Sequence, residues 1–199
     1  MPAEARRQAI LAAAMRVFAA KGYAGAGTSD VAQAAGIGEP TIYRYFANKR
    51  ELYEAALEET GAHISQSWRR IAAEHPRAIE AIAHLASWYI AELQAHPEAM
   101  VLRLRSLAEG DAEAMAGARE RYAELERFVG ELYARAQEQG DAPEAVSPRA
   151  AAWLFMAVGS YFDVNALVRR PTLDQPQLAE LFSVLARALW QPNAEGVTG

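Results

Sequence analysis

The sequence predicts an all-α protein of about nine helices, in which an amino-terminal three-helix helix-turn-helix domain precedes a larger helical bundle. Apolar residues recur at helical spacing almost throughout the chain, and no convincing run of alternating β-branched residues is present. Glycines and prolines divide this pattern into segments of helical length. A basic amino-terminal quarter precedes an acidic remainder, which indicates two parts with different tasks.

Glycines separate the first three predicted helices from one another. These helices span Ala3–Lys21, Thr28–Ala35 and Glu39–Phe46. Gly22 follows the first helix, and Gly36 lies at the corner between the second and the third. Two short helices around a glycine turn are typical of a helix-turn-helix motif. Residues 1–47 are therefore predicted to form one domain.

A second set of longer helices is predicted to start at Asn48. The Asn48 side chain is expected to accept a hydrogen bond from the Glu51 N–H while the Glu51 side chain reaches back, which is a reciprocal helix cap. The six helices predicted after this point span residues 49–73, 77–96, 98–108, 112–139, 148–170 and 176–190. We assign residues 48–190 to a second domain and residues 191–199 to a disordered tail.

Charge is distributed unevenly along the chain. The formal net charge is −5, but residues 1–50 hold seven Lys/Arg and three Asp/Glu, a balance of +4. Residues 51–199 hold 13 Lys/Arg and 22 Asp/Glu, a balance of −9. Because phosphate contacts dominate nucleic-acid affinity, the basic first segment is expected to meet a polyanion. Chance variation in a short window is the alternative that this count leaves open.

Composition excludes several kinds of site. The chain has no cysteine, so disulfides, thiolate metal sites and a cysteine nucleophile are excluded. The charged amino terminus lacks the apolar region of a secretory signal, and we expect a cytoplasmic protein. The longest uncharged run, Ala150–Phe162, has 13 residues, fewer than the roughly 20 that span a bilayer. A buried helix is predicted there.

The last two predicted helices carry more apolar surface than one packing partner covers. The helix from Pro148 is apolar on more than one face, and the next helix adds a stripe at i, i+3 and i+4 spacing. A homodimer formed through these helices would provide the second surface. The predicted dimerisation residues are Trp153, Tyr161, Leu178, Phe182, Leu185 and Leu189. Packing of both helices inside a monomeric core is the alternative.

Aromatic and cationic side chains are concentrated in residues 43–50. This stretch holds Tyr43, Arg44, Tyr45, Phe46, Lys49 and Arg50. The second helix of a helix-turn-helix enters the major groove while flanking groups hold phosphates, which requires both cations and flat side chains. We expect Tyr43, Tyr45 and Lys49 to contact phosphates. Ile42 and Phe46, four residues apart, are expected to face inward onto the first helix.

A pattern of about 35 residues with fixed gaps runs through this region. It consists of Phe18, Gly22-Tyr23, Asp30-Val31-Ala32, Ala35-Gly36-Ile37, Thr41 to Phe46 and Asn48 to Leu52. In these residues the chain resembles the TetR family of transcriptional regulators. The resemblance implies a homodimeric repressor whose carboxy-terminal domain, residues 48–190 here, binds a small molecule and thereby releases operator DNA. Activation in place of repression stays open.

Two departures from the family pattern affect the DNA contacts that the resemblance implies. The second helix begins Ala26-Gly27-Thr28 in place of a Thr or Ser pair, so Thr28 or Ser29 is expected to cap it, with a phosphate contact near Thr28. The recognition helix begins Gly38-Glu39-Pro40 in place of a Ser. The predicted DNA-binding residues are Thr28, Gly38, Glu39, Pro40, Thr41, Tyr43, Arg44, Tyr45 and Lys49.

The base contacts are assigned by chemistry alone. Glu39 could accept a hydrogen bond from a cytosine amino group, and Pro40 and the Thr41 methyl group could touch a thymine methyl group. Arg44 could contact guanine or a phosphate.

The implied effector site is expected to hold an apolar or aromatic molecule, oriented by a few polar groups, because the second domain is rich in aromatic residues. For any one of these residues, core packing is the alternative. The predicted ligand-binding residues are His63, Trp68, His84, Leu85, Trp88, Tyr89, Arg103, Leu104, Tyr122, Phe155 and Asn165. No cofactor, metal or membrane partner is expected.

Two other functions are weighed against regulation. A helical-bundle enzyme would need metal-ligand or nucleophile motifs, but the Glu/His pairs here are four residues apart, unlike the Glu-x-x-His motif of di-iron bundles. We therefore predict that the protein is not an enzyme. A DNA-binding protein without an effector is the other alternative, although its second domain would be larger than dimerisation requires.

Overall fold

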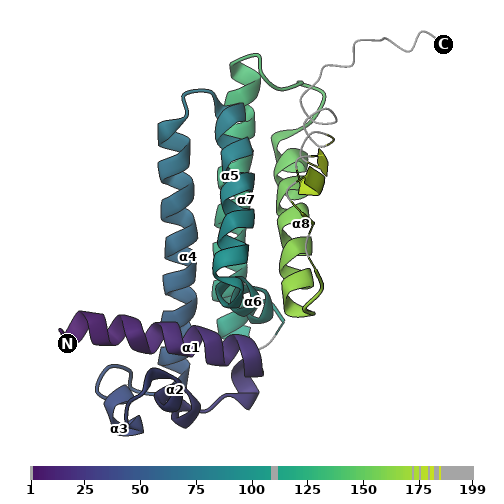
Figure 1. The fold of residues 1–199 in the computed structure, drawn as a ribbon. Coiled ribbons are helices and arrows are strands. Elements are labelled where there is room, and N and C mark those ends of the chain that lie inside the picture. Colours follow the sequence, from purple (N-terminus) through teal and green to yellow (C-terminus); the bar gives the residue numbers. More distant parts are fainter. Residues whose placement is uncertain are drawn as a thin grey trace. The chain divides into compact units, whose positions relative to one another are not determined.

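The computed structural model describes residues 2–108, 112–171, 173–174, 176–178, 180–181 and 184. This part of the chain is all-helical, which confirms the predicted fold class (Figure 1). Its bounded helices are α1 (Ala3–Gly25), α2 (Thr28–Ala35), α3 (Glu39–Ile42), α4 (Lys49–Glu74), α5 (Ala78–Ala95), α6 (Pro97–Ser106), α7 (Ala112–Glu138) and α8 (Pro148–Leu167). Residues described between 176 and 184 are helical, and the predicted tail lies outside the described residues.

Most helix boundaries lie within a few residues of those predicted from the sequence, and those of α2 coincide with them. Gly36 explains the sharp end of α2, because it adopts the left-handed conformation (φ 65°) and its N–H returns to the Ala32 carbonyl. The third helix is shorter than predicted and ends at Ile42 in place of Phe46. Residues 43–45, which were predicted to be helical, form a tight turn.

Contacts divide the chain into two compact units. One comprises Met1–Gln66 and Leu93–Tyr122, and the other comprises Ser67–Glu92 and Ala123–Gly199. Helices α4, α5 and α7 contribute residues to both units. We predicted a domain boundary between residues 47 and 48 from the helix-turn-helix pattern and the cap at Asn48. This boundary is not one based on contacts, and it stays a prediction.

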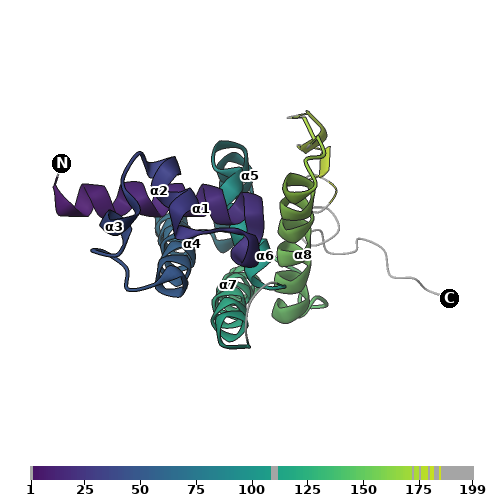
Figure 2. The ribbon, with the colours of Figure 1, turned by 90° about the horizontal axis from the view of Figure 1, so that it is seen from below.

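In the first unit, α1 packs against α2 and α6, and α2 packs against α3. Figures 1 and 2 both show α2 and α3 together beside α1. The core of this unit is formed by fully buried apolar side chains, among them Ile10, Leu11, Phe18, Val31, Ile42 and Leu52. These residues come from four successive helices, α1–α4, so each short helix is held by burial against the others.

A kink at Gly22 interrupts α1. Gly22 has φ 71° and ψ 170°, a conformation that is essentially restricted to glycine, and it is buried. The Ala26 N–H donates to the Gly22 carbonyl at 3.2 Å and closes the turn that leads to α2. The breaker predicted at this position is therefore a conformational requirement of the chain.

The second unit is built from the end of α4 and from α5, α7 and α8. Trp68 of α4 packs edge-on against Phe155 of α8, with ring centroids 5.8 Å apart, and its ring lies 6.3 Å from that of Phe128 in α7. Helices α7 and α8 approach closely, because a Cβ atom at Gly130 would lie 3.8 Å from that of Ala152. Aromatic contacts and small residues thus set the helix spacing in this unit.

Helix α8 is less buried than we predicted from its composition. Its inner side buries Ala151, Ala152, Met156 and Phe162, whereas Trp153 and Tyr161 are 64% and 62% exposed. By length and hydropathy α8 could cross a membrane, but a third of its most apolar window is buried, and core helices of soluble proteins meet the same criterion. The predicted second apolar face is confirmed as exposed in the single chain.

Gly22→Ala is expected to destabilise the protein by about 1–3 kcal/mol, because a Cβ atom disfavours the positive φ at this position. Urea unfolding followed by circular dichroism measures the change. Gly25→Ala is the matched control, since a Cβ atom there would meet only the Lys21 Cβ at an ordinary 3.8 Å. Equal stability losses in the two variants would contradict the assigned role of Gly22.

Candidate nucleic-acid interface

The short helix α3 and the turn after it are anchored by two side chains. Ile42 is fully buried and Phe46 is 2% exposed, so both face inward as predicted. The guanidinium of Arg7 in α1 lies 5.5 Å from the centroid of the Phe46 ring, which places this ring against α1. The Phe46 N–H donates to the Ile42 carbonyl at 3.0 Å, so the turn after α3 keeps the inward register although the helix itself has ended.

Helix α2 is capped from inside its first turn. The Asp30 carboxylate accepts a hydrogen bond from the Gly27 N–H at 2.9 Å. Its other oxygen lies 2.7 Å from Nζ of Lys21, and these contacts lower the pKa of Asp30 below its usual value, with the Lys21 hydrogen bond as the largest cause and the Gly27 bond next. The prediction that Thr28 or Ser29 caps this helix is wrong, because the cap residue is Gly27 and Asp30 supplies the acceptor.

The hydroxyl of Thr28 joins the two helices of the motif. It donates to Oε1 of Glu39 at 2.5 Å, and it lies 3.0 Å from the hydroxyl of Tyr43. Thr28 is 8% exposed, so its hydroxyl is used inside the protein, where we had expected a phosphate contact. The start of α2 is therefore tied both to the start of α3 and to the residue that follows α3.

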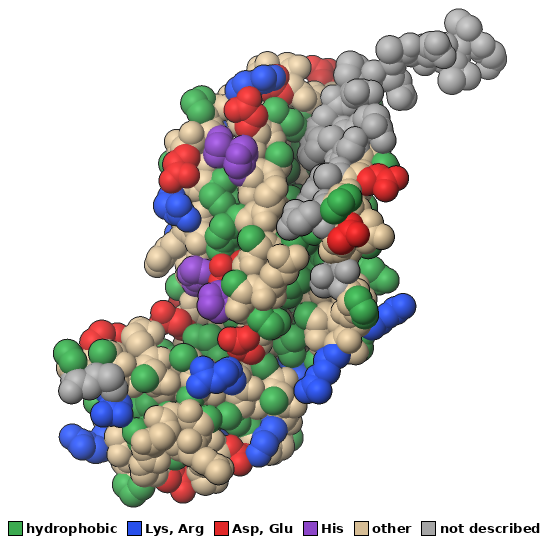
Figure 3. Space-filling model, in the orientation of Figure 1, with side chains coloured by type: hydrophobic (Ala, Val, Ile, Leu, Met, Phe, Trp, Pro, Cys, Tyr) green, Lys and Arg blue, Asp and Glu red, His purple; other side chains and the backbone are tan. Residues whose placement is uncertain are grey.

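The remaining predicted DNA-binding residues line the outer side of the motif. Gly38, Pro40, Tyr43 and Arg44 are exposed, with Tyr43 at 51%. Residues of intermediate burial are Glu39, Thr41, Tyr45 and Lys49. Figure 3 shows cationic side chains and carboxylates interspersed over α1–α3 on the face drawn, so the surface there is mixed in charge. Such a surface can combine phosphate contacts with base contacts.

Lys49 is positioned by an aromatic residue that our site prediction did not include. Its Nζ lies 4.5 Å from the centroid of the Tyr23 ring, which in turn packs 4.8 Å from the Tyr53 ring. Tyr53 also meets Phe18 edge-on at 5.0 Å. Tyr23 belongs to the Gly22-Tyr23 pair of the family pattern, but no local spacing indicated that it would hold the first residue of α4.

The cap of α4 differs by one residue from the predicted one. The Glu51 N–H donates to Oδ1 of Asn48 at 2.9 Å, as predicted. The returning bond comes from the Ala47 N–H, which donates to Oε2 of Glu51 at 2.6 Å. Backbone N–H groups on both sides of the helix start, those of Ala47 and Glu51, therefore have side-chain acceptors, and Lys49 lies inside this capped turn.

The predicted ligand-binding residues divide between the two units. In the first unit, His63 is exposed, Leu104 is half-buried, and the Arg103 guanidinium lies 5.5 Å from the Tyr122 ring centroid. Arg103 and Arg105 are both half-buried, and the Nε atom of each is buried.

In the second unit, Trp68, Leu85 and Tyr89 are buried, while Trp88 and Phe155 are half-buried. Tyr89 donates from its hydroxyl to Oδ1 of Asp163 at 2.6 Å, a buried pair that the sequence did not indicate. Asn165 is buried, and its amide donates to the Tyr161 carbonyl at 2.9 Å.

His84 does not point into a buried site. It is exposed and stacks on His75, with ring centroids 3.9 Å apart.

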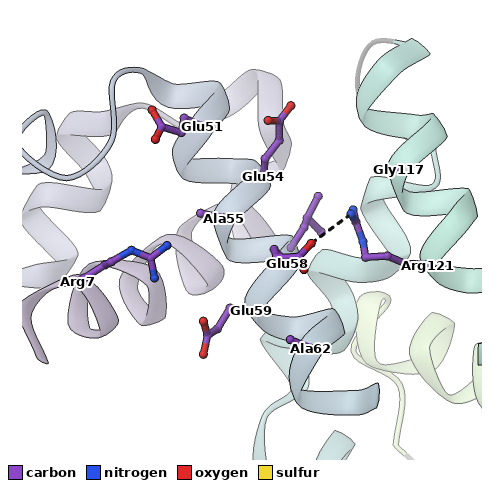
Figure 4. Close-up of a pocket in the computed structure, with 10 residues that line it drawn as sticks. Arg7, Glu51, Glu54, Ala55, Glu58, Glu59, Ala62, Gly117 and Arg121 are labelled. Atoms are coloured by element: carbon purple, nitrogen blue, oxygen red, sulfur yellow. Dashed lines mark ion pairs between the residues drawn. The ribbon is translucent and has the colours of Figure 1, made fainter. Parts of the chain in front are cut away.

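Two surface hollows are lined by other residues. A hollow of about 480 Å³ in the first unit has the α4 carboxylates of Glu51, Glu54, Glu58 and Glu59 along one wall. Arg121 of α7 lies 3.8 Å from Glu58, as the dashed line in Figure 4 marks. A hollow of about 430 Å³ in the second unit lies between α7 and α8 around Gly130 and Ala152. Neither contains a predicted ligand-binding residue, and the first is bordered by charged side chains from α1, α4 and α7.

The predicted dimerisation residues differ in their surroundings. Trp153 and Tyr161 are exposed, as an interface requires. Leu178 is 4% exposed, so it is already covered within the chain and does not offer free surface, contrary to our expectation. Phe182, Leu185 and Leu189 lie outside the described residues.

Comparison with known proteins places this motif among bacterial regulators. Residues 10–56 match the profile described as "Bacterial regulatory proteins, tetR family". The HTH-type transcriptional activator FasR of Mycolicibacterium smegmatis is 41% identical over 58 residues, which are 29% of this chain and 26% of that protein. The uncharacterized HTH-type transcriptional regulator YvkB of Bacillus subtilis is 29% identical over 99 residues, 50% of this chain and 51% of that protein.

The chain therefore spans about a quarter and about half of the length of these two relatives. The likeness to solved structures extends further. The structure of AibR in complex with isovaleryl coenzyme A and operator DNA has a TM-score of 0.75 at 20% identity, and the match covers 94% of this chain and 99% of that chain. At this identity the likeness shows a shared fold.

The Asp30 carboxylate is expected to stabilise the protein at neutral pH but not in acid. Its pKa is lowered in the folded chain, so its contribution is present above the unfolded value of about 3.9 and is lost as the pH falls through the lower folded value. Asp30→Asn should therefore lower the Tm at pH 7, and the difference from wild type should shrink towards pH 3. Glu4→Gln, which removes an exposed carboxylate of α1, is the control. A difference that stays constant with pH would contradict this role.

Proposed function

Because the chain belongs to the TetR family of bacterial regulatory proteins, we propose that it is a homodimeric repressor that binds a pseudo-palindromic operator and is released by a small-molecule effector. The observation that carries the proposal is the two-sided character of α3 and its following turn. Ile42 and Phe46 are buried against the domain, while Pro40, Tyr43 and Arg44 are presented outward. A helix-turn-helix requires this division, because the recognition helix must be held from behind while it enters the major groove.

The proposed DNA contacts separate into positioning and reading. Lys49 and Tyr45 are assigned to phosphates, since the α4 cap and the Tyr23 ring hold Lys49 beside the motif. Glu39, Pro40, Thr41 and Arg44 are assigned to base edges. In a dimer, the two recognition helices would read half-sites about 34 Å apart, or a small multiple of a helical turn, on one face of the duplex.

The exposed face of α8 supports the dimer. Trp153, Ala157, Tyr161, Val164 and Val168 are all exposed, and their spacing of four, four, three and four residues puts them on one side of the helix. An apolar stripe of this length on a soluble protein is typical of an interface. A two-fold contact would bury the stripe against its own copy.

An effector site in the second unit is supported by Trp68. The ring is 2% exposed, and its buried Nε1–H has no hydrogen-bond acceptor within the part of the chain that the structure describes. Leaving such a donor unpaired costs free energy, which a bound molecule with an acceptor would recover. AibR was solved with isovaleryl coenzyme A, so short acyl thioesters, which join an apolar chain to a carbonyl acceptor, are the first compounds to test.

The proposed mechanism is a shift in population. The effector would favour a conformation of the chain in which the recognition helices no longer match the two half-sites, with α4 as the connecting lever. A transcription factor that meets DNA in a bacterial cell would act in the cytoplasm. Activation is the second candidate function, favoured by the relative FasR, whose name describes an activator.

Lys49→Ala is expected to weaken binding to all duplexes and to reduce the salt-dependence slope by roughly 0.9 through the loss of one phosphate contact. Arg44→Ala should change base preference at one position of the half-site if it reads a base. The measurement is selection of operator sites from random DNA, followed by anisotropy titrations at two salt concentrations.

Arg69→Ala is the matched control for these variants, because this exposed cation belongs to the same helix but lies 20 residues after Lys49, in the second unit. Recovery of no site by the wild-type protein, or affinities unchanged in both Lys49→Ala and Arg44→Ala, would refute the DNA-binding proposal. Acyl thioesters are then added to the complex with the same labelled operator, and a fall in anisotropy measures release of the DNA.

Trp153→Glu and Tyr161→Glu are each expected to convert the dimer to a monomer, because a carboxylate at either position would be buried without a partner in a two-fold interface. Sedimentation equilibrium measures the change. Ala83→Glu, which adds the same charge at an exposed position of α5, should leave the dimer intact. A monomeric wild-type protein would show that the α8 stripe is not a self-association surface.

A further inference from the structure

The hydrogen bonds of Thr28, Glu39 and Tyr43 indicate a task for Tyr43 that differs from phosphate contact. Resting on the proposed DNA-binding function, we propose that Tyr43 and Thr28 are positioning residues that hold the Glu39 carboxylate as the reader of a cytosine in each half-site. The three residues are referred to below as the Glu39 clamp.

The direction of the hydrogen bonds in the clamp follows from counting protons. Each hydroxyl has one hydrogen to donate, and an ionised carboxylate only accepts. The Thr28 hydroxyl therefore gives its hydrogen to Oε1 of Glu39. The contact of 3.0 Å between the two hydroxyl oxygens must then be a bond from Tyr43 to Thr28. The resulting chain runs from Tyr43 through Thr28 to Glu39.

This order leaves the Tyr43 hydroxyl without a hydrogen for a phosphate oxygen. A phosphate oxygen is an acceptor, and a phenol whose only hydrogen is already donated offers it nothing but lone pairs. Our expectation from the sequence assigned Tyr43 and Tyr45 the same phosphate role. In the structure only Tyr43 is committed to the clamp, so the two tyrosines are expected to respond differently to removal of their hydroxyl groups.

The clamp restrains a side chain that would otherwise be mobile. A Glu side chain that is free to rotate loses rotamer entropy when it is fixed against a base. This loss offsets part of the free energy gained from the hydrogen bond to the correct base, and so weakens discrimination between bases. Thr28 is 8% exposed and sits in the first turn of α2, so its hydroxyl is a fixed point. Glu39 is half-buried, which orders the carboxylate before DNA arrives while leaving its second oxygen free of contacts within the clamp.

A carboxylate held in the major groove favours cytosine. Cytosine presents the N4 amino donor there, and Glu or Asp accepting from this group is its usual partner. Guanine presents two acceptors, and thymine presents an acceptor and a methyl group, so both would face a carboxylate unfavourably. Adenine has an amino donor beside the N7 acceptor, and the acceptor would lie against the second carboxylate oxygen. The clamp therefore predicts one cytosine-specific position per half-site.

The test compares full-length variants on selected operators in which the assigned position carries each of the four bases. Wild type should prefer cytosine by roughly tenfold. Glu39→Ala should abolish the preference, and Glu39→Gln should shift it towards adenine, with which a carboxamide makes two bonds. Thr28→Val and Tyr43→Phe should each reduce the preference to about twofold or threefold, with a salt slope that differs from wild type by less than one lost phosphate contact. Tyr45→Phe is the contrasting variant, for which the slope should fall.

Outcomes that overturn the proposal are separable from failure of the DNA-binding function. If wild type selects a site but Tyr43→Phe lowers the salt slope by about 0.9 and keeps the cytosine preference, Tyr43 contacts a phosphate and the clamp is wrong. If no position responds to Glu39→Ala, the base assignment is wrong. If wild type selects no site, both proposals fail together. Tyr43 is exposed, so Tyr43→Phe provides the decisive result even where Thr28→Val folds poorly.

Discussion

The proposed DNA-binding surface depends on the burial of Ile42 and Phe46. Helix α3 has four residues, too few to be stable alone, because the first turn of a helix fixes several torsions for a single hydrogen bond. Its orientation is therefore set from behind, by two apolar side chains that are almost completely covered. Burial of this pair orients the backbone of α3 and its turn, and so determines which of their side chains face outward. The short helix can then present small and polar groups outward without needing helix-forming residues of its own.

Local rules predicted α2 well and α3 less well, for identifiable reasons. Gly36 ends α2 because its left-handed conformation is a local property of glycine. Ile42 and Phe46 have a spacing of four, which a longer helix and a helix followed by a tight turn satisfy equally. The prediction for the cap of α2 is wrong because capping preferences favour a side chain at the cap position, whereas Asp30 reaches back to Gly27 from within the helix.

The residue types of the candidate interface were predictable, but their partners were not. Lys49 and Tyr23 are 26 positions apart and meet through the tertiary fold, and Thr28 and Glu39 meet across the turn of the motif. In the second unit, composition indicated that α8 needs two covering surfaces, and the exposed Trp153 agrees with this. It could not show that Leu178 is already covered within the chain, because periodicity identifies an apolar face but not its partner.

The chain of hydrogen bonds from Tyr43 through Thr28 to Glu39 also has an evolutionary consequence. Residues in one hydrogen-bond network do not act additively, so the effect of a change at any of the three depends on the other two. With Glu39 as the proposed base reader, a lineage that exchanges Thr28 for an aliphatic residue would lose the orientation of Glu39 without acquiring a new base preference. Evolution of a different operator preference would therefore pass through a variant with reduced base specificity that binds several sites. Divergence of the regulated genes would begin from that variant.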